Sequence, residues 1–136
     1  MNLSKVIFII TIIFFQQIAS SDQWVEIGAD AEAIYFVDLN SIHKAEDSHT
    51  IIKRAIYNQY RTEYLGSSKV TFISTIGVVE LDCNLNINRV IQIDMLDGDD
   101  NVVWSSGYME KRIWQDVRDN THAKKTYDLV CKNHKE

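Results

Sequence analysis

The sequence predicts an α+β fold, in which a strongly bent antiparallel β-sheet carries a C-terminal helix tied to it by one disulfide. Short runs of alternating apolar and polar residues, the pattern of half-buried strands, recur between turns rich in glycine, asparagine and aspartate. The apolar residues of 121–132 recur instead with helical spacing. The third observation is the cysteine content, because the chain has only Cys83 and Cys131.

Residues 1–21 have the pattern of a signal peptide. Lys5 precedes the apolar stretch 6–15, which is too short to span a bilayer comfortably, and small residues follow it. We expect cleavage after Ser20 or Ser21, and an uncleaved membrane anchor is the alternative. The leader predicts an exported protein that is periplasmic, secreted or held at the cell surface.

Residues 22–136 have the size of a single domain. Without Lys5, 13 basic residues stand against 19 acidic ones, which gives a net charge of −6. This charge disfavours nucleic acid and anionic lipid as partners, and it is compatible with a cationic protein partner. No second apolar run has spanning length, so we expect no membrane span after the leader is removed.

The first half of the domain predicts two short strands. Residues 24–28 alternate and end at a glycine, and residues 33–37 are rich in β-branched and aromatic side chains. We expect Asp38 to leave the sheet by capping one helical turn over residues 38–42. The polar segment 43–49 then predicts a loop.

Two long strands follow in the middle of the chain. Residues 50–61 form the third strand, and their isoleucines and tyrosines favour a strand over the competing helix. One face of this strand carries Ile52, Ile56 and Tyr60, and the other carries Ile51, Lys53, Ala55, Tyr57 and Gln59. Residues 70–83 predict one long strand, or two strands joined at Gly77. Its inward face is predicted to carry Val79, Leu81 and Cys83.

The last elements are a hairpin and a helix. Residues 89–96 alternate again, with Ile91, Ile93 and Met95 expected to point inward. An Asp-Gly turn at 97–100 leads into a return strand at 101–109. After a charged connection, residues 121–132 form the helix, capped by Asn120 or Thr121. Its inner stripe is Ala123, Tyr127, Val130 and Cys131.

An exported domain with an even number of cysteines is typical of a disulfide-bonded protein. The prediction is therefore a Cys83–Cys131 bond, and two buried free thiols are the alternative. The loop that it closes is long, so the chain-entropy model gives roughly 4 kcal/mol of stabilisation.

No catalytic, cofactor-binding or metal-binding residues are predicted, and we expect a protein that is not an enzyme. The four histidines lie in polar segments without metal-site spacing, and they are interpreted as solvated loop residues: His43, His49, His122 and His134. Residues 97–101 lack the ligand alternation of a calcium loop and predict an acidic turn. With the cysteines paired, no thiol nucleophile remains, and no serine stands in a nucleophile-elbow pattern.

An ordered set of segments resembles the surface-adhesin protein E family. The set comprises residues 34–42 (IYFVDLNSI), residues 79–83 (VELDC), Arg89, Gly98, Trp114 and Cys131. The resemblance extends from Trp24 to Cys131. It implies a bacterial cell-envelope protein whose antiparallel sheet holds a C-terminal helix on its concave face through a disulfide.

The namesake of that family is an outer-surface adhesin that binds host matrix and plasma proteins. This sequence departs from the pattern in two places. It lacks a lipoprotein cysteine, and Asp119, Asn120 and Thr121 stand where the family usually has a proline-containing turn. No segment matches the namesake's host-binding regions, so no functional residue carries over.

Two functions are compatible with these observations. The first is an exported, non-catalytic envelope protein with an adhesin-like role, whose partner is another protein such as a host matrix protein. Exposed aromatic side chains would then anchor the partner. The alternative is a periplasmic inhibitor of a secreted cationic enzyme such as lysozyme, for which a negative surface would speed the encounter.

Overall fold

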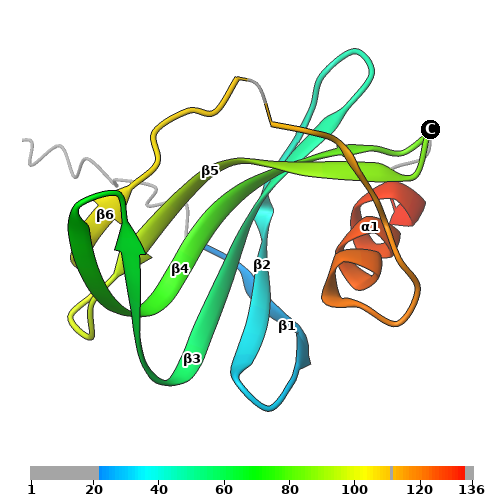
Figure 1. Cartoon of the computed structure of the whole chain (residues 1–136). Helices are drawn as coiled ribbons and strands as arrows, with labels where there is room; N and C mark the ends of the chain where they lie inside the picture. The colour runs from blue at the N-terminus through cyan, green and yellow to red at the C-terminus, as the bar shows by residue number, and fades with distance from the viewer. Residues whose placement is uncertain (1–21, 111, 134–136) are drawn as a thin grey trace, which may run out of the picture.

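The computed structural model describes residues 22–110 and 112–133, which form one open antiparallel sheet and a C-terminal helix (Figure 1). The elements are β1 (Trp24–Ala29), β2 (Ala33–Lys44), β3 (His49–Leu65), β4 (Ser68–Asp82), β5 (Ile87–Leu96), β6 (Val102–Ser105), β7 (Gln115–Asp116) and α1 (His122–Asn133). The predicted signal peptide at 1–21 and His134 lie outside the described residues. The predicted fold class is confirmed.

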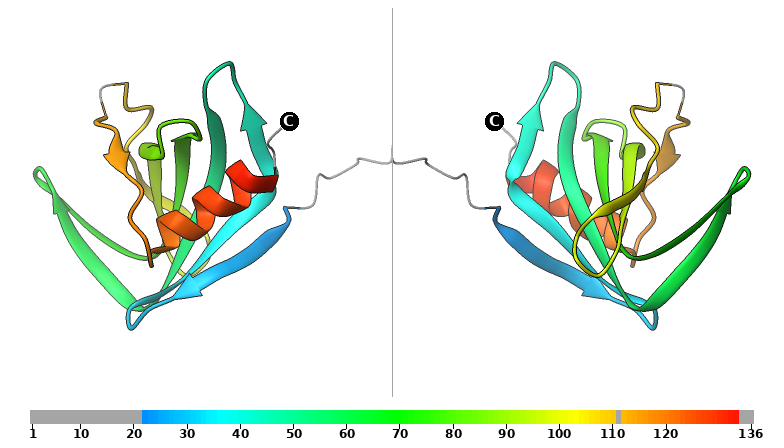
Figure 2. Two further views of the ribbon diagram at one scale, coloured as in Figure 1. Left: turned by 90° about the vertical axis from the view of Figure 1, so that its right-hand side faces the viewer. Right: turned by 90° about the vertical axis from the view of Figure 1, so that its left-hand side faces the viewer.

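The order of the strands in the sheet follows their order in the chain, from β1 to β6. Each neighbouring pair is antiparallel, and β7 adds a short pairing to β5. The register between β3 and β4 shifts between Ile56 and Arg61. Beyond that shift, residues 61–72 form a hairpin arm that diverges from the rest of the sheet, so the sheet is strongly bent (Figure 2). The helix lies inside this bend.

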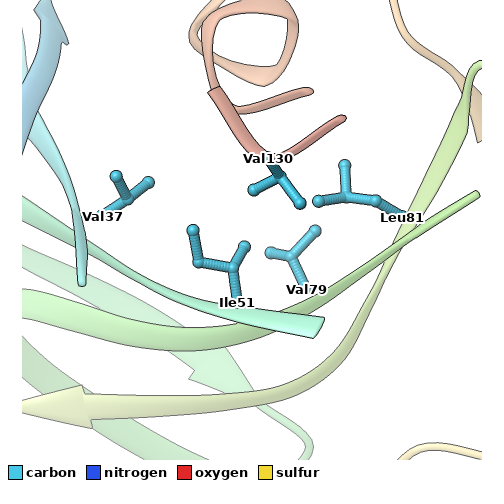
Figure 3. Close-up of a cluster of buried hydrophobic side chains, with 5 residues drawn as sticks. All are labelled: Val37, Ile51, Val79, Leu81 and Val130. Atoms are coloured by element: carbon cyan, nitrogen blue, oxygen red, sulfur yellow. The ribbon is translucent and has the colours of Figure 1, made fainter. Parts of the chain in front are cut away.

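The core forms where the helix meets the concave face of the sheet. Its fully packed residues come from β2, β3, β4 and α1, and they point toward one another in Figure 3: Val37, Ile51, Val79, Leu81 and Val130. Val79 and Leu81 share this face because alternate side chains of a strand point to the same side, and the register places Ile51 directly opposite Val79. The predicted inward positions of Val79 and Leu81 are therefore confirmed.

The disulfide joins the end of β4 to the last turn of the helix. Cys83 and Cys131 are bonded, with an S–S distance of 2.01 Å and a Cα–Cα distance of 5.5 Å. Tyr127, one turn earlier on the helix, packs against the core and donates a hydrogen bond from Oη to the carbonyl oxygen of Cys83 at 2.6 Å. Covalent and polar links therefore attach the helix to the same end of β4.

The start of the helix has the predicted side-chain cap. The Oγ1 atom of Thr121 accepts a hydrogen bond from the backbone N–H of Lys124 at 3.1 Å, which satisfies one of the free donors of the first turn. Asn120, just before it, has a φ of 61°. Asparagine tolerates this left-handed conformation better than most residues, so the tight turn into the helix forms without proline.

The prediction of a helical turn after Asp38 was wrong, because β2 continues to Lys44 through a bulge. The buried Asp38 carboxylate does accept the backbone N–H groups of Gln23 and Asn40, each at 3.0 Å. However, the Ser41 hydroxyl donates to the carbonyl of Asp38 at 2.6 Å and accepts from the N–H of Ile52 at 2.8 Å. This side chain replaces a missing ladder bond and keeps the strand in the sheet.

A second bulge changes the inner face of β5. The register pairs Val78 with Gln92 but Val79 with Val90, so Val90 joins Ile93 and Met95 on the concave side. The return strand β6 is shorter than predicted, although backbone N–H groups of Ser106 and Met109 still donate to β5. The connection before the helix, predicted to be irregular, contains the two-residue strand β7.

Candidate functional site

Two surfaces of the sheet can receive a partner: a cleft on its concave face and an apolar patch on its outer face. Within residues 22–110 and 112–133, no three His, Cys, Asp or Glu side chains come together in a way that could hold a metal ion. Both cysteines are used in the disulfide.

The cleft occupies the part of the concave face that the helix leaves open, and its volume is about 430 Å³. Its floor is the central sheet, with Ala55, Gly77, Val79, Val90, Ile93 and Met95. The hairpin arm contributes a second wall with Arg61, Glu63, Leu65 and Phe72, and Tyr35 and His122 form the wall next to the helix. The cleft thus has a largely apolar floor and a polar rim.

Lys53 lines this cleft from β3, on the same face as Ile51 and Ala55, as the alternation predicted. Its Nζ atom lies 3.0 Å from Nδ1 of His122. No carboxylate of the described residues forms an ion pair with it, and burial lowers the pKa of Lys53 to about 8. An ammonium group in an apolar cleft without an anionic partner is an unusual arrangement, because desolvation disfavours the charged form.

The other guanidinium groups around the cleft already have acidic partners. Arg61 pairs with Glu32 at 3.0 Å and with Glu63 at 3.8 Å. Arg54 also contributes to the lining, but its guanidinium lies on the outer face of β3, where it pairs with Asp100 at 2.5 Å. Among the lysine and arginine side chains that line the described cleft, Lys53 therefore differs in having no carboxylate beside it.

His122 is held in place by a stack and a hydrogen-bond chain. Its ring lies parallel to that of Tyr35, with centroids 4.1 Å apart. Tyr35 in turn donates to the Asp30 carboxylate at 2.8 Å, and burial together with this bond raises the pKa of Tyr35 to about 12. Burial and the nearby Lys53 lower the pKa of His122, although Asp30 opposes them. The neutral imidazole is thus favoured beside Lys53.

The interpretation of the histidines as solvated loop residues was wrong for His49, which is buried, and it was wrong in part for His122, which is exposed but lies on the helix. His49 is buried at the start of β3, and its Nδ1 lies 3.5 Å from Sγ of Cys83. It faces inward because the preceding turn is tight and β3 begins one residue earlier than expected. His122 is the first residue of α1 and carries the stacked ring described above. His43 is exposed, as predicted.

The acidic turn at 97–101 is confirmed, and most of its charge serves the turn itself. Oδ1 of Asp97 accepts the backbone N–H groups of Asp99 and Asn101, each at 2.9 Å. The bonds from Asn101 and Asp99 lower the pKa of Asp97. Asp100 is paired with Arg54, so two of the three aspartates of this turn are engaged within the domain.

The outer apolar face covers β2, β3 and β4 on the side opposite the helix. It consists of the even-numbered residues Ile34, Phe36, Ile52, Ile56, Ile76 and Val78. Ile34 lies directly opposite Ile56, and Ile52 lies opposite Val78. Ile34 and Ile56 are 42% and 38% exposed. In the described part of the chain no helix covers this face (Figure 2).

The aromatic residues divide between exposed positions and the packed framework. Tyr60, Tyr64 and Tyr108 are exposed, whereas all three tryptophans are half-buried. Trp114 packs against the Arg89 guanidinium, 4.5 Å from its ring centroid, and Arg89 pairs with Glu80 at 2.9 Å. Trp114 thus fixes the connection before the helix to the edge of the sheet.

The described residues contain no helix with the length and apolar character needed to cross a membrane. Neither the curated proteins nor the solved structures that were compared with the chain match it. The family model of surface-adhesin protein E matches residues 24–132. This span includes the whole sheet, nearly all of the helix and both disulfide cysteines. The chain therefore belongs to the surface-adhesin protein E family.

Proposed function

We propose that this protein is an exported, adhesin-like protein of the bacterial envelope that holds another protein on its outer apolar face and catalyses no reaction. Membership of the family suggests a surface adhesin-like protein with protein partners. The features of the sheet identify the surface that we assign to this role.

The observation that carries the proposal is the uncovered outer apolar face. Six apolar side chains on three adjacent strands share a face that no described helix covers, and they surround Arg54, which lies opposite Phe36 and Ile76. Burying apolar surface is favourable by about 25 cal/mol per Å². Contiguous exposed apolar patches on otherwise folded proteins commonly mark sites of interaction.

The surroundings of the patch also suit a protein interface. Gln92 and Asp94 lie on the neighbouring strand, opposite Val78 and Ile76, and the Arg54–Asp100 ion pair lies within the same face. Apolar side chains around an arginine suit a protein–protein interface, because arginine is enriched at such interfaces. Because the patch is built on paired strands, a partner would not have to order it on binding.

A pair of matched variants tests the assignment. The protein is expressed from its full sequence, purified, and measured against immobilised host matrix and plasma proteins. Ile56→Glu places a charge in the patch, whereas Ile113→Glu makes the same change at a position that is 81% exposed and lies outside the patch. We expect Ile56→Glu to weaken binding about tenfold or more and Ile113→Glu to leave it unchanged.

Circular dichroism and the melting temperature show whether both variants are folded. Equal binding by the two variants would remove the outer apolar face from the proposal. Lysozyme serves as the contrasting partner: inhibition that declines as ionic strength rises would instead support the inhibitor hypothesis.

Export is the second part of the proposal and has its own test. The apolar stretch at 6–15 followed by small residues supports removal of residues 1–21. We expect the intact mass of the protein isolated from its native cell envelope to correspond to a chain beginning at Ser21 or Asp22. A mass that includes the leader would contradict this expectation.

A further inference from the structure

We infer that the cleft on the concave face binds a small amphipathic anion, a medium-chain fatty acid, with its carboxylate at Lys53 and its alkyl chain along the apolar floor. This site lies on the opposite face of the sheet from the outer apolar face. It therefore does not depend on the binding function proposed above.

The size and lining of the cleft suit the body of such a ligand. A volume of about 430 Å³ falls within the range typical of small-molecule sites, which is roughly 300–1,000 Å³. Val90, Ile93 and Met95 provide an apolar strip along β5, and Leu65 and Phe72 face it from the hairpin arm. An unbranched alkyl chain carries no polar group. Its burial against this lining therefore leaves no hydrogen-bond donor or acceptor of the ligand unpaired.

The positive charge of Lys53 in the cleft favours a ligand with an anionic head group. The cations and anions around the cleft are Lys53, Arg54, Arg61 and Glu63, and its other titratable groups are Tyr35, Tyr57 and His122. Arg54 and Arg61 have carboxylate partners, and Glu63 is one of them. Lys53 is left to attract an incoming anion.

A carboxylate would complete the environment of this lysine. Burial already penalises the ammonium group, and His122 can offer it only a neutral ring nitrogen. A carboxylate at Nζ would form a charge-assisted hydrogen bond in a partly desolvated site, where such a bond is stronger than at an exposed surface. A neutral or cationic head group gains nothing comparable at this position.

Isothermal titration of the purified full-length chain with decanoate, decanol and decyltrimethylammonium, each below its micelle concentration, tests the inference. We expect decanoate to bind about tenfold or more tightly than decanol, and the cation to bind most weakly. The methyl resonance of Met95 should shift on addition of decanoate, because Met95 lines the cleft. Equal affinity for decanoate and decanol would overturn the inference.

Two lysine variants separate the cleft from the rest of the surface. Lys53→Met keeps the aliphatic stem and removes the charge, so decanoate should lose its advantage over decanol. Lys125→Met makes the same change on the exposed side of the helix and should leave decanoate affinity unchanged. Unchanged affinity in Lys53→Met would overturn the inference. The inference would also be overturned if the protein bound a peptide with a free apolar C-terminus tightly and did not bind decanoate.

Discussion

The two faces of the central sheet are about equally rich in isoleucine and valine, yet among the described residues a helix covers only one of them. On the concave face, Ile51 is completely buried against the helix. Its neighbour in the chain, Ile52, points to the other side, where it lies between Asp38 and Val78 on the adjacent strands and is only half-buried. The comparison teaches that the covering element, and not the residue type, decides whether an apolar strand face becomes core or binding surface.

The largest loss of stability is expected from removing the disulfide that holds the helix on the sheet. Replacing both Cys83 and Cys131 with alanine should lower the free energy of unfolding by about 4 kcal/mol, because the bond closes a loop of 48 residues. Urea unfolding of the oxidised protein and the double variant measures the difference. Reduction of the unmodified protein should reproduce most of it, and a loss below about 1 kcal/mol would mean that the helix needs no tether.

The adjacent isoleucines test the comparison directly. Ile51→Ala should cost about 3 kcal/mol, because it leaves a cavity beneath the helix. Ile52→Ala should cost about 1 kcal/mol, because its side chain is only half-buried and water can fill the space. The same urea series measures both variants. Equal losses would show that the outer face is as well packed as the core and would contradict the contrast between them.

A substitution in the open part of the concave face should stabilise the protein, in contrast to the substitutions above. At pH 7, Lys53→Met should raise the free energy of unfolding by about 3 kcal/mol, because the folded protein holds a lysine whose pKa has fallen from 10.5 to about 8. Between these two values the unfolded chain binds more protons than the folded one. Stability of the unmodified protein should therefore rise across this pH window relative to the variant.

Chemical denaturation at pH 7, 8, 9 and 10 (about one unit apart across that window) measures the difference in unfolding free energy between the two proteins, which should decrease as the pH rises. Lys125→Met is the control, since this lysine is exposed and its substitution should show no such pH dependence. A difference in unfolding free energy that stays constant with pH would show that the Lys53 ammonium is solvated.

The smallest effect concerns a single hydrogen bond at the closed end. Tyr127→Phe removes the bond from Oη to the Cys83 carbonyl and should cost about 1 kcal/mol while the disulfide remains. Tyr108→Phe, at an exposed tyrosine, should change little. Melting temperatures of the two variants under oxidising conditions provide the comparison. A Tyr127→Phe variant as stable as the unmodified protein would show that water replaces the lost bond.

Period and composition were enough to predict most of the architecture. The two-residue alternation located β3, β4 and β5, and the helical spacing located α1. The cysteine pair was identified from the predicted export and from the even number of cysteines. The bulge at Ser41 was missed because a side-chain hydroxyl, and not a hydrophobic pattern, keeps that segment in the sheet. Val90 was missed because a shift in pairing register leaves no mark on alternation.

The candidate surfaces were predictable only in part. The alternation already placed Lys53 beside Ile51 and Ala55 on one face of the third strand, and Ile52 with Ile56 on the other. It could not say which face the helix would cover, because both are apolar. Nor could it show that the start of the helix would place His122 beside Lys53 at the edge of an open cleft.

The sequential order of the strands also has a consequence for how the chain matures. Successive hairpins close short loops, so the sheet can assemble step by step from local pairings. Helix α1 instead packs against β1 and β2, at the far end of the sequence, and this long-range docking is expected late. Oxidation of the cysteines then follows docking. In an exported protein, the disulfide would then prevent the helix from undocking, so the last folding step would no longer be reversible.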